Sequence, residues 1–179
     1  MLRVLIVPLI SIIFILGIIW LIKNSNKRIN EALIKVSEDL DFLYSPPKNI
    51  FKKKITTGTI DGYKCEIIVY TQSHGKSSTT YISFFTYFPD SLNMGIKINW
   101  RGEFEGDDDY LANLFIERNT DLVESQKKKL RRLKITDTYV NSRKILFKKY
   151  FNPVEIVKTM HDVVDLTKKI HKSFLCTNT

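Results

Sequence analysis

The sequence predicts an α+β fold, in which an N-terminal transmembrane helix precedes an antiparallel sheet of about four strands plus a second hairpin, packed by two or three helices. Three observations predict it: an uncharged apolar stretch at the start, a block of strand-like segments in the middle, and helix-like segments in the second half. Strands and helices that are segregated along the chain, without βαβ alternation, are typical of this class. We divide the chain into an anchor at 1–23, a juxtamembrane helix at 24–48 and an α+β domain at 49–179.

Residues 4–22 read VLIVPLISIIFILGIIWLI and contain no charged side chain. A helix of this length, at about 1.5 Å per residue, nearly matches the roughly 30 Å of a bilayer's hydrocarbon core. A cleaved secretory signal is the alternative, but its apolar region covers about 7–15 residues and ends at small side chains. This stretch is longer and ends at Trp20, Leu21 and Ile22. We therefore expect a retained single span.

The charges that flank this stretch predict its orientation. Arg3 precedes it, whereas Lys23, Lys27, Arg28 and Lys35 follow it closely. Lys and Arg prefer the cytoplasmic side, so we expect the N-terminus outside and the C-terminal domain in the cytoplasm. The whole chain carries 28 Lys and Arg against 19 Asp and Glu, a formal charge of +9. This balance favours anionic lipid head groups as partners ahead of nucleic acid.

An apolar stripe follows the predicted span, in the segment before Pro46-Pro47. Its members recur at steps of four and three, which is typical of one face of a helix. The stripe either packs against the domain or forms a dimer seam, and it is shorter than the three or four heptads that indicate a coiled coil. We therefore expect packing against the domain. The stripe consists of Ile29, Leu33, Val36, Leu40 and Leu43.

Two hairpins are predicted. The segments ITTGTI and YKCEIIVY flank Asp61-Gly62, a pair that suits the positive φ angles of a type I′ turn. Residues 79–88 and 95–101 add two further strands, the second with clean alternation of apolar and polar side chains. TDTYV and RKILFK predict the second hairpin, with its turn at Asn141-Ser142. Strands joined by short turns indicate an antiparallel sheet.

The second half of the chain predicts helices. Asp121, followed three residues later by Glu124, has the pattern of a helix cap, and the helix is expected to continue to about Lys134. Asn152 and Pro153 predict the start of the last helix, because Asn caps the exposed amides and Pro suits the first turn.

The triplet Gly75-Lys76-Ser77 resembles the end of a phosphate-binding loop, but the rest of the motif is missing. Such a loop has a second glycine five residues before the first of these, where this chain has Tyr70. It must also open a helix, whose N-terminus stabilises the anion. A β-prone segment follows instead, so the triplet predicts a turn between strands.

A run of cations, KKKLRRLK at 127–134, is the most informative surface feature. On the predicted helix, its two leucines face inward and the cations cover the remaining surface. Three interpretations stay open: contact with anionic lipid, nucleic-acid binding, and a solvated helix face whose cations match the helix dipole. The candidate anion- or lipid-binding residues are Lys127, Lys128, Lys129, Arg131, Arg132 and Lys134.

An aromatic strand at 79–88 provides a second candidate surface. Because side chains alternate across a strand, Phe84 and Phe88 are expected in the core, with Tyr81, Phe85 and Tyr87 on the opposite face. If no other element covers that face, it is a protein-contact site.

No catalytic, metal or cofactor-binding motif stands out in the sequence, and we expect no cofactor and no metal. We therefore predict a non-catalytic membrane-anchored module that binds a protein or anionic lipid. The alternative is a membrane-tethered enzyme whose site is assembled from distant residues, such as His74, Glu66 and Asp137, in a deep pocket. A nucleic-acid-binding module is a less favoured alternative.

Overall fold

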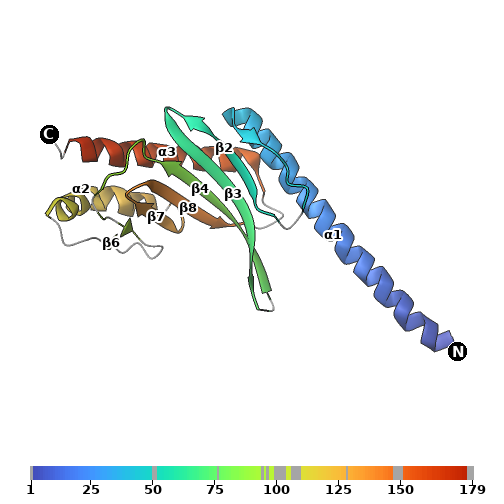
Figure 1. The fold of residues 1–179 in the computed structure, drawn as a ribbon. Coiled ribbons are helices and arrows are strands. Elements are labelled where there is room, and N and C mark those ends of the chain that lie inside the picture. The colour runs from blue at the N-terminus through green and yellow to red at the C-terminus, as the bar shows by residue number, and fades with distance from the viewer. Residues whose placement is uncertain are drawn as a thin grey trace.

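The computed structural model describes the backbone of residues 2–49, 52–75, 77–93, 95, 97–98, 104–105, 110–127, 129–146 and 151–176. The fold is α+β, with three described helices and one antiparallel sheet. The helices are α1 (Leu2–Leu40), α2 (Tyr110–Lys127) and α3 (Pro153–Leu175). The strands are β1 (Leu43–Tyr44), β2 (Lys54–Ile60), β3 (Tyr63–His74), β4 (Ser77–Tyr87), β5 (Lys97–Ile98), β6 (Phe104–Glu105), β7 (Leu133–Thr136) and β8 (Tyr139–Ile145). Their order across the sheet is β1-β2-β3-β4-β8-β7-β5-β6 (Figure 1).

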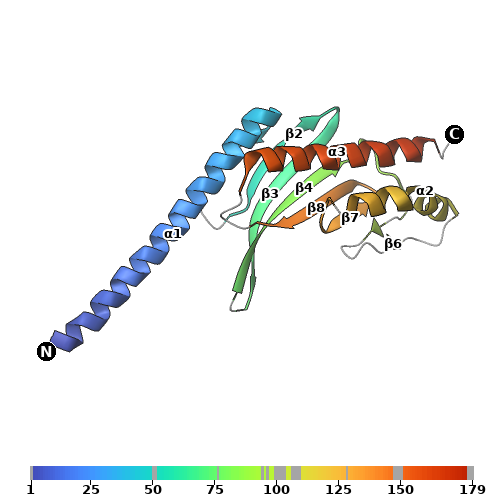
Figure 2. The same ribbon diagram turned by 180° about the vertical axis from the view of Figure 1, so that it is seen from behind.

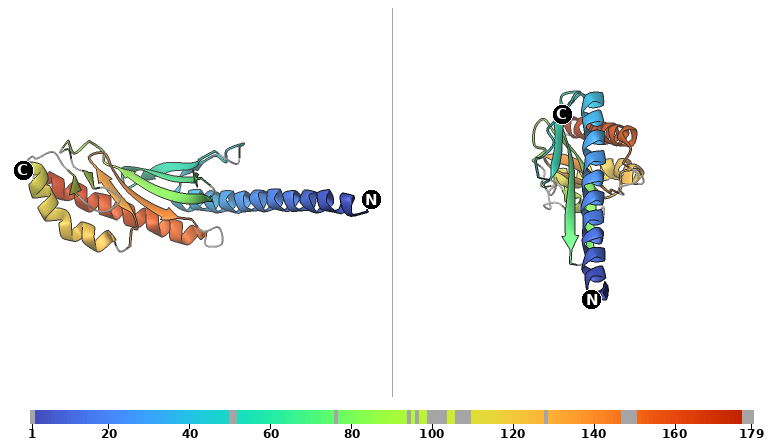
Figure 3. Two further views of the ribbon diagram at one scale, coloured as in Figure 1. Left: turned by 90° about the horizontal axis from the view of Figure 1, so that it is seen from below. Right: turned by 90° about the vertical axis from the view of Figure 1, so that its right-hand side faces the viewer.

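The helices lie together on one face of this sheet. Figure 2 shows α3 running in front of β3 and β4, with the last turns of α1 beside it, and α3 also contacts β8. The edge-on view places α2 and α3 below the strands, and the opposite face of the strands points away from the helices (Figure 3). The sheet therefore has one helix-covered face and one open face, an arrangement that is common for antiparallel sheets.

The C-terminal half of α1 packs on the domain, which confirms the preferred use of the predicted apolar stripe. Ile29, Leu33, Val36 and Leu40 are buried in the core. Leu43 departs from the prediction: it lies in β1 and is 81 % exposed. The helix ends before it, and the amide of Phe42 donates a 2.8 Å hydrogen bond to the carbonyl of Ser37.

The structure contradicts the prediction that residues 4–22 form a transmembrane span. The N-terminal part of α1 projects away from the sheet (Figure 1), and its described side chains are exposed from Ile12 to Leu21. Residues 4–11 of the predicted span lie outside the residues whose side chains are described. Over the part of the chain that is described, no helix carries an apolar stretch long enough to cross a bilayer. The charged side chain of Lys23 ends the described apolar stretch. This finding contradicts the predicted single-pass localisation with a cytoplasmic domain.

The predicted first hairpin and the turn at the glycine-lysine-serine triplet are confirmed. Asp61 and Gly62 join β2 to β3 with φ angles of 50° and 83°, as a type I′ turn requires. Gly75 joins β3 to β4 with a φ angle of 61°, and Ser77 already pairs with His74 in the sheet. The long β3–β4 hairpin extends beyond its neighbours (Figure 1).

The second hairpin exists, but its turn lies earlier than predicted. Asn141 and Ser142 are inside β8, and the turn between β7 and β8 falls at Asp137 and Thr138. The hydroxyl oxygen of Thr136 explains the position, because it accepts hydrogen bonds from the amides of Thr138 and Tyr139 at 3.4 and 3.2 Å. A threonine hydroxyl that binds the backbone two residues on is a recognised turn former.

The helix predicted to begin at Asp121 and reach Lys134 has different bounds. Asp121 lies inside α2, which begins at Tyr110 and ends at Lys127. The chain then turns, and residues from Leu133 form β7 against β8. Leu133 and Ile135 are buried while Lys134 and Thr136 are partly exposed, which is the period-two pattern of a strand. By contrast, the predicted Asn152 cap of α3 is confirmed, because its side chain accepts a hydrogen bond from the amide of Val154.

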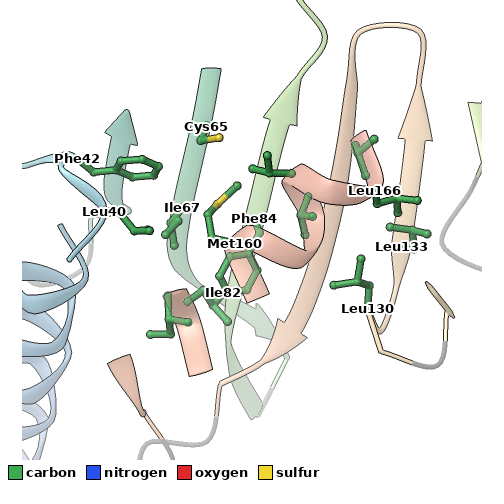
Figure 4. Close-up of a cluster of buried hydrophobic side chains, with 14 of the residues drawn as sticks. Leu40, Phe42, Cys65, Ile67, Ile82, Phe84, Leu130, Leu133, Met160 and Leu166 are labelled. Atoms are coloured by element: carbon green, nitrogen blue, oxygen red, sulfur yellow. The ribbon is translucent and has the colours of Figure 1, made fainter. Parts of the chain in front are cut away.

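The core lies between the helix-covered face of the sheet and α3. Phe84 of β4 is 1 % exposed and lies near Ile67, Ile82 and Met160 in the close-up view (Figure 4). Phe84 and Phe88 are buried as predicted. Of the strand predicted at 95–101, the structure describes residues 95, 97 and 98.

Candidate functional site

A pocket with a volume of about 590 Å³ opens where β4 and β8 meet the first turns of α3. The turn between α2 and β7 forms its remaining wall. Its volume is in the range of about 300–1,000 Å³ that is typical of small-molecule sites. The lining residues are Ile82, Phe84, Lys129, Arg131, Arg132, Arg143, Lys144, Ile145, Leu146, Phe151, Asn152, Glu155, Ile156 and Thr159. We call this site the basic pocket.

Among the described residues, five basic residues and one acidic residue line the basic pocket. Three cations come from the turn before β7 and two from β8. The carboxylate is Glu155, in the first turn of α3. This excess of positive charge favours a negatively charged ligand. The cations are Lys129, Arg131, Arg132, Arg143 and Lys144.

Buried leucines fix the turn that presents three of these cations. Leu130 is 1 % exposed, and its amide donates a 2.8 Å hydrogen bond to the carbonyl of Gln126 at the end of α2. The hydroxyl of Ser142 donates to the carbonyl of Arg131 at 3.3 Å, which joins the turn to β8. Arg132 has a φ angle of 51°, which reverses the chain into β7. Lys129, Arg131 and Arg132 themselves are exposed.

Lys144 connects β8 to α3 on the far side of the pocket. Its ammonium group donates a 2.8 Å hydrogen bond to the hydroxyl of Thr159 and lies 3.5 Å from Oε1 of Glu155. Glu155 is well exposed, so this ion pair is screened and contributes little stability. The N-terminal turn of α3, capped by Asn152, adds a partial positive charge to the same wall.

Arg143 is held by two aromatic side chains. Its Nη1 donates a 3.3 Å hydrogen bond to the hydroxyl of Tyr70. Its guanidinium carbon lies 4.7 Å from the centroid of the Tyr81 ring, within cation–π range. The strand register places both rings on the face of the sheet opposite Ile82 and Phe84, so these contacts direct the guanidinium group of Arg143 away from the apolar floor of the pocket.

The floor of the basic pocket is apolar. Ile82, Phe84 and Ile156 are buried beneath it, and Leu146 and Phe151 are partly buried beside them. A ligand that fits this site therefore combines an anionic group, held by the cations, with an apolar portion that lies against the floor.

The structure divides the predicted basic run between two surfaces. Lys129, Arg131 and Arg132 line the basic pocket. Lys134 lies in β7, with its ammonium 5.9 Å from the ring centroid of Tyr139. The side chains of Lys127 and Lys128 lie outside the described residues.

Sequence reasoning did not identify Arg143 and Lys144 as pocket residues. The predicted turn at Asn141-Ser142 would have directed them elsewhere. The signal that could have identified them is their position in a second basic segment, RKILFKK, close to the first in sequence.

The remaining predicted residues lie outside the pocket lining. Tyr81, Phe85 and Tyr87 alternate with the core residues of β4, and the strand register places them on the open face of the sheet. Glu66 accepts a 3.0 Å hydrogen bond from the hydroxyl of Tyr87 on that face. Asp137 accepts a 2.9 Å hydrogen bond from the amide of Gly95. These two carboxylates do not converge in the pocket, and the side chain of His74 lies outside the described residues.

Comparisons of this chain with protein-family models, with curated proteins and with solved structures found no match. Its function must therefore be inferred from the chemistry of the site.

Proposed function

We propose that this protein is a binding module for an amphipathic anion, meaning a ligand with a phosphate-type group next to an apolar portion. The observation that carries the proposal is a pocket with an apolar floor that is lined by Lys129 and Arg131 of the turn before β7 and by Lys144 of β8. Guanidinium and ammonium groups hold the anionic group by charge-assisted hydrogen bonds. The apolar floor gains free energy when the ligand displaces water from it.

The same chemistry is found in two kinds of ligand: a soluble organic phosphate and the head group of an anionic lipid. In both, a negatively charged phosphate adjoins an apolar part, and each surface cation contributes about 1 kcal/mol to binding an anionic lipid surface. The pocket's affinity for either ligand should fall as ionic strength rises, because the contributing cations are exposed and screened.

The test measures binding of octyl phosphate to the full chain by titration calorimetry, with inorganic phosphate in a parallel titration. Octyl phosphate should bind more tightly than inorganic phosphate, because only the former occupies the apolar floor. Sedimentation with vesicles of phosphatidylserine or of phosphatidylcholine then distinguishes the two sources. Binding to phosphatidylserine vesicles indicates a lipid head group, and binding to octyl phosphate alone indicates a soluble ligand.

The variant Lys129→Gln/Arg131→Gln removes two exposed pocket cations without touching the core. We expect it to weaken binding about 30-fold, from roughly 1 kcal/mol for each cation. The matched control, Lys158→Gln/Lys169→Gln, removes two exposed cations of α3 that do not line the pocket and should change affinity less than about twofold. The proposal is overturned if the two variants lose affinity equally, or if the protein binds neither octyl phosphate nor anionic vesicles.

A further inference from the structure

The open face of the sheet carries a cluster of aromatic side chains, which we call the aromatic face. The strand register places its members together on β3, β4 and β8. The centroid of the Phe85 ring lies 6.3 Å from that of Tyr87 and 5.5 Å from that of Tyr139. A second pair of rings lies beside them, with centroids 5.6 Å apart. The aromatic face consists of Tyr70, Tyr81, Phe85, Tyr87 and Tyr139.

No described helix covers this face. All three helices lie on the other side of the sheet, as the rear and edge-on views show (Figure 2, Figure 3). Tyr81 is 7 % exposed, and the other four rings are partly exposed. Aromatic side chains that remain open to solvent on the central strands of a sheet mark an interaction surface.

Five cationic groups lie over these rings. The ammonium of Lys64 is 5.1 Å from the centroid of the Tyr87 ring, and the guanidinium of Arg143 is 4.7 Å from that of Tyr81. Three further cationic groups each lie 5.9 Å from a ring centroid; they belong to Lys53, Arg132 and Lys134. The cations thus lie on both sides of β4. On one side, Lys53 precedes β2 and Lys64 belongs to β3; on the other, Arg143 belongs to β8, Lys134 to β7 and Arg132 to the turn before β7.

Negative charge on this face is limited and already paired. In β2, β3, β4, β7 and β8, the register places one carboxylate here, that of Glu66. Its Oε1 lies 3.4 Å from the ammonium of Lys64, and its Oε2 accepts the hydrogen bond from Tyr87. Among the described residues, the aromatic face therefore carries more positive than negative charge.

We propose that the aromatic face binds single-stranded nucleic acid. Such a strand presents flat bases, which stack on aromatic rings, and regularly spaced phosphates, which pair with cations on either side. The face supplies a central line of rings flanked by cations, so the two chemistries are complementary. This inference concerns the face opposite the helices and does not depend on the ligand of the basic pocket.

Two other polyanions fit less well. A duplex keeps its bases stacked inside, so the rings would have no base to contact. An acidic polypeptide would use the cations but gains little from the rings. The participation of both the rings and the cations therefore distinguishes a single strand from either alternative.

The test is fluorescence anisotropy of the full chain with a labelled oligothymidylate of about 20 nucleotides, which exceeds the roughly 4–16 nucleotides that one OB-fold domain covers. Lys64→Gln/Lys134→Gln should weaken binding at least tenfold. If each lysine meets one phosphate, it should also reduce the slope of log affinity against log salt by about 1.4. Phe85→Leu keeps an apolar side chain but removes a ring, and we expect at least a fivefold loss with an unchanged salt slope.

Two variants serve as matched controls. Lys35→Gln/Lys169→Gln removes two exposed helix cations, and Lys129→Gln/Arg131→Gln removes two cations of the basic pocket. Both should leave oligothymidylate binding within about twofold. Circular dichroism checks that every variant is folded. The inference is overturned if oligothymidylate does not bind, if a polyglutamate peptide binds as tightly, if the control variants lose as much affinity, or if Phe85→Leu binds normally.

Discussion

Gly58→Ala tests the contact that holds the end of α1 on the sheet. Phe42 follows α1, is 6 % exposed, and lies against Gly58 of β2. A Cβ at position 58 would lie 2.1 Å from Cδ1 and 2.6 Å from Cγ of the Phe42 ring. Carbon atoms in contact are about 3.5–4.0 Å apart, so the ring would have to move by about 1.5 Å. Overpacking of this kind costs about 1–3 kcal/mol, and we expect Gly58→Ala to lower the free energy of unfolding by that amount.

Urea unfolding followed by circular dichroism measures this loss as a lower midpoint with an unchanged slope. Gly17→Ala is the matched control, because nothing lies within 4 Å of the added Cβ in the middle of α1. It should be neutral or slightly stabilising, since alanine favours helix over glycine. In a Phe42→Ala background the ring is gone, and Gly58→Ala should then cost less than about 0.5 kcal/mol. The reasoning is refuted if Gly58→Ala costs the same in both backgrounds.

Three further predictions concern capping, packing and ionisation. Asn152→Ala removes the hydrogen bond to the Val154 amide, and a thermal melt should show a loss of about 1 kcal/mol. Leu33→Ala empties a fully buried site under α1 and should cost about 2–5 kcal/mol in urea unfolding. The pKa of Tyr87 is raised to about 12, mainly by burial and further by Glu66, so in an absorbance titration Glu66→Gln should lower it while leaving it above 10.0. Because the pKa of this hydroxyl is higher in the folded state, the stability that it contributes is complete below pH 10.0 and is lost as the pH rises towards 12. In Tyr87→Phe, the free energy of unfolding should therefore fall less between pH 10 and pH 12 than it does in the unmodified protein.

The features that sequence reasoning predicted correctly depend on local physics. The turn at Asp61-Gly62 needs positive φ angles that these two residues adopt readily. The cap of α3 needs only the Asn152 side chain and the amide two residues later. The buried stripe from Ile29 to Leu40 has a helical period, so its inward face could be identified without knowledge of its partner.

The errors arise where a longer-range contact decides between two local possibilities. Leu130 and Leu133 are compatible with a helical face, yet pairing with β8 draws Leu133 into a strand. The asparagine-serine pair at 141–142 has the composition of a turn, but Thr136 closes the hairpin earlier. Cooperative pairing between strands cannot be recognised from composition alone.

The basic pocket could not be predicted for the same reason. Its cations come from a turn and a strand whose neighbourhood depends on the β7–β8 register. Sequence analysis identified the cations at 129–132 but assigned them to a helix, where they would spread around the axis. In the structure, buried Leu130 and Leu133 fix the turn, and Lys129 and Arg131 line the same pocket as Lys144.

The placement of charge links the basic pocket to the aromatic face. Among the described residues that line the pocket, basic residues outnumber acidic ones, and the carboxylate of Glu155 already contacts Lys144. Such clustering does not stabilise the fold, because like charges brought together disfavour the compact state. Arg132 and Arg143 also line the pocket, but their guanidinium carbons lie 5.9 and 4.7 Å from the centroid of the Tyr81 ring, so their charges belong to the aromatic face. A bound anion at either surface would offset the positive charge of the residues at that surface. This excess of positive charge is the observation on which both proposed ligands, an amphipathic anion at the pocket and single-stranded nucleic acid at the aromatic face, depend.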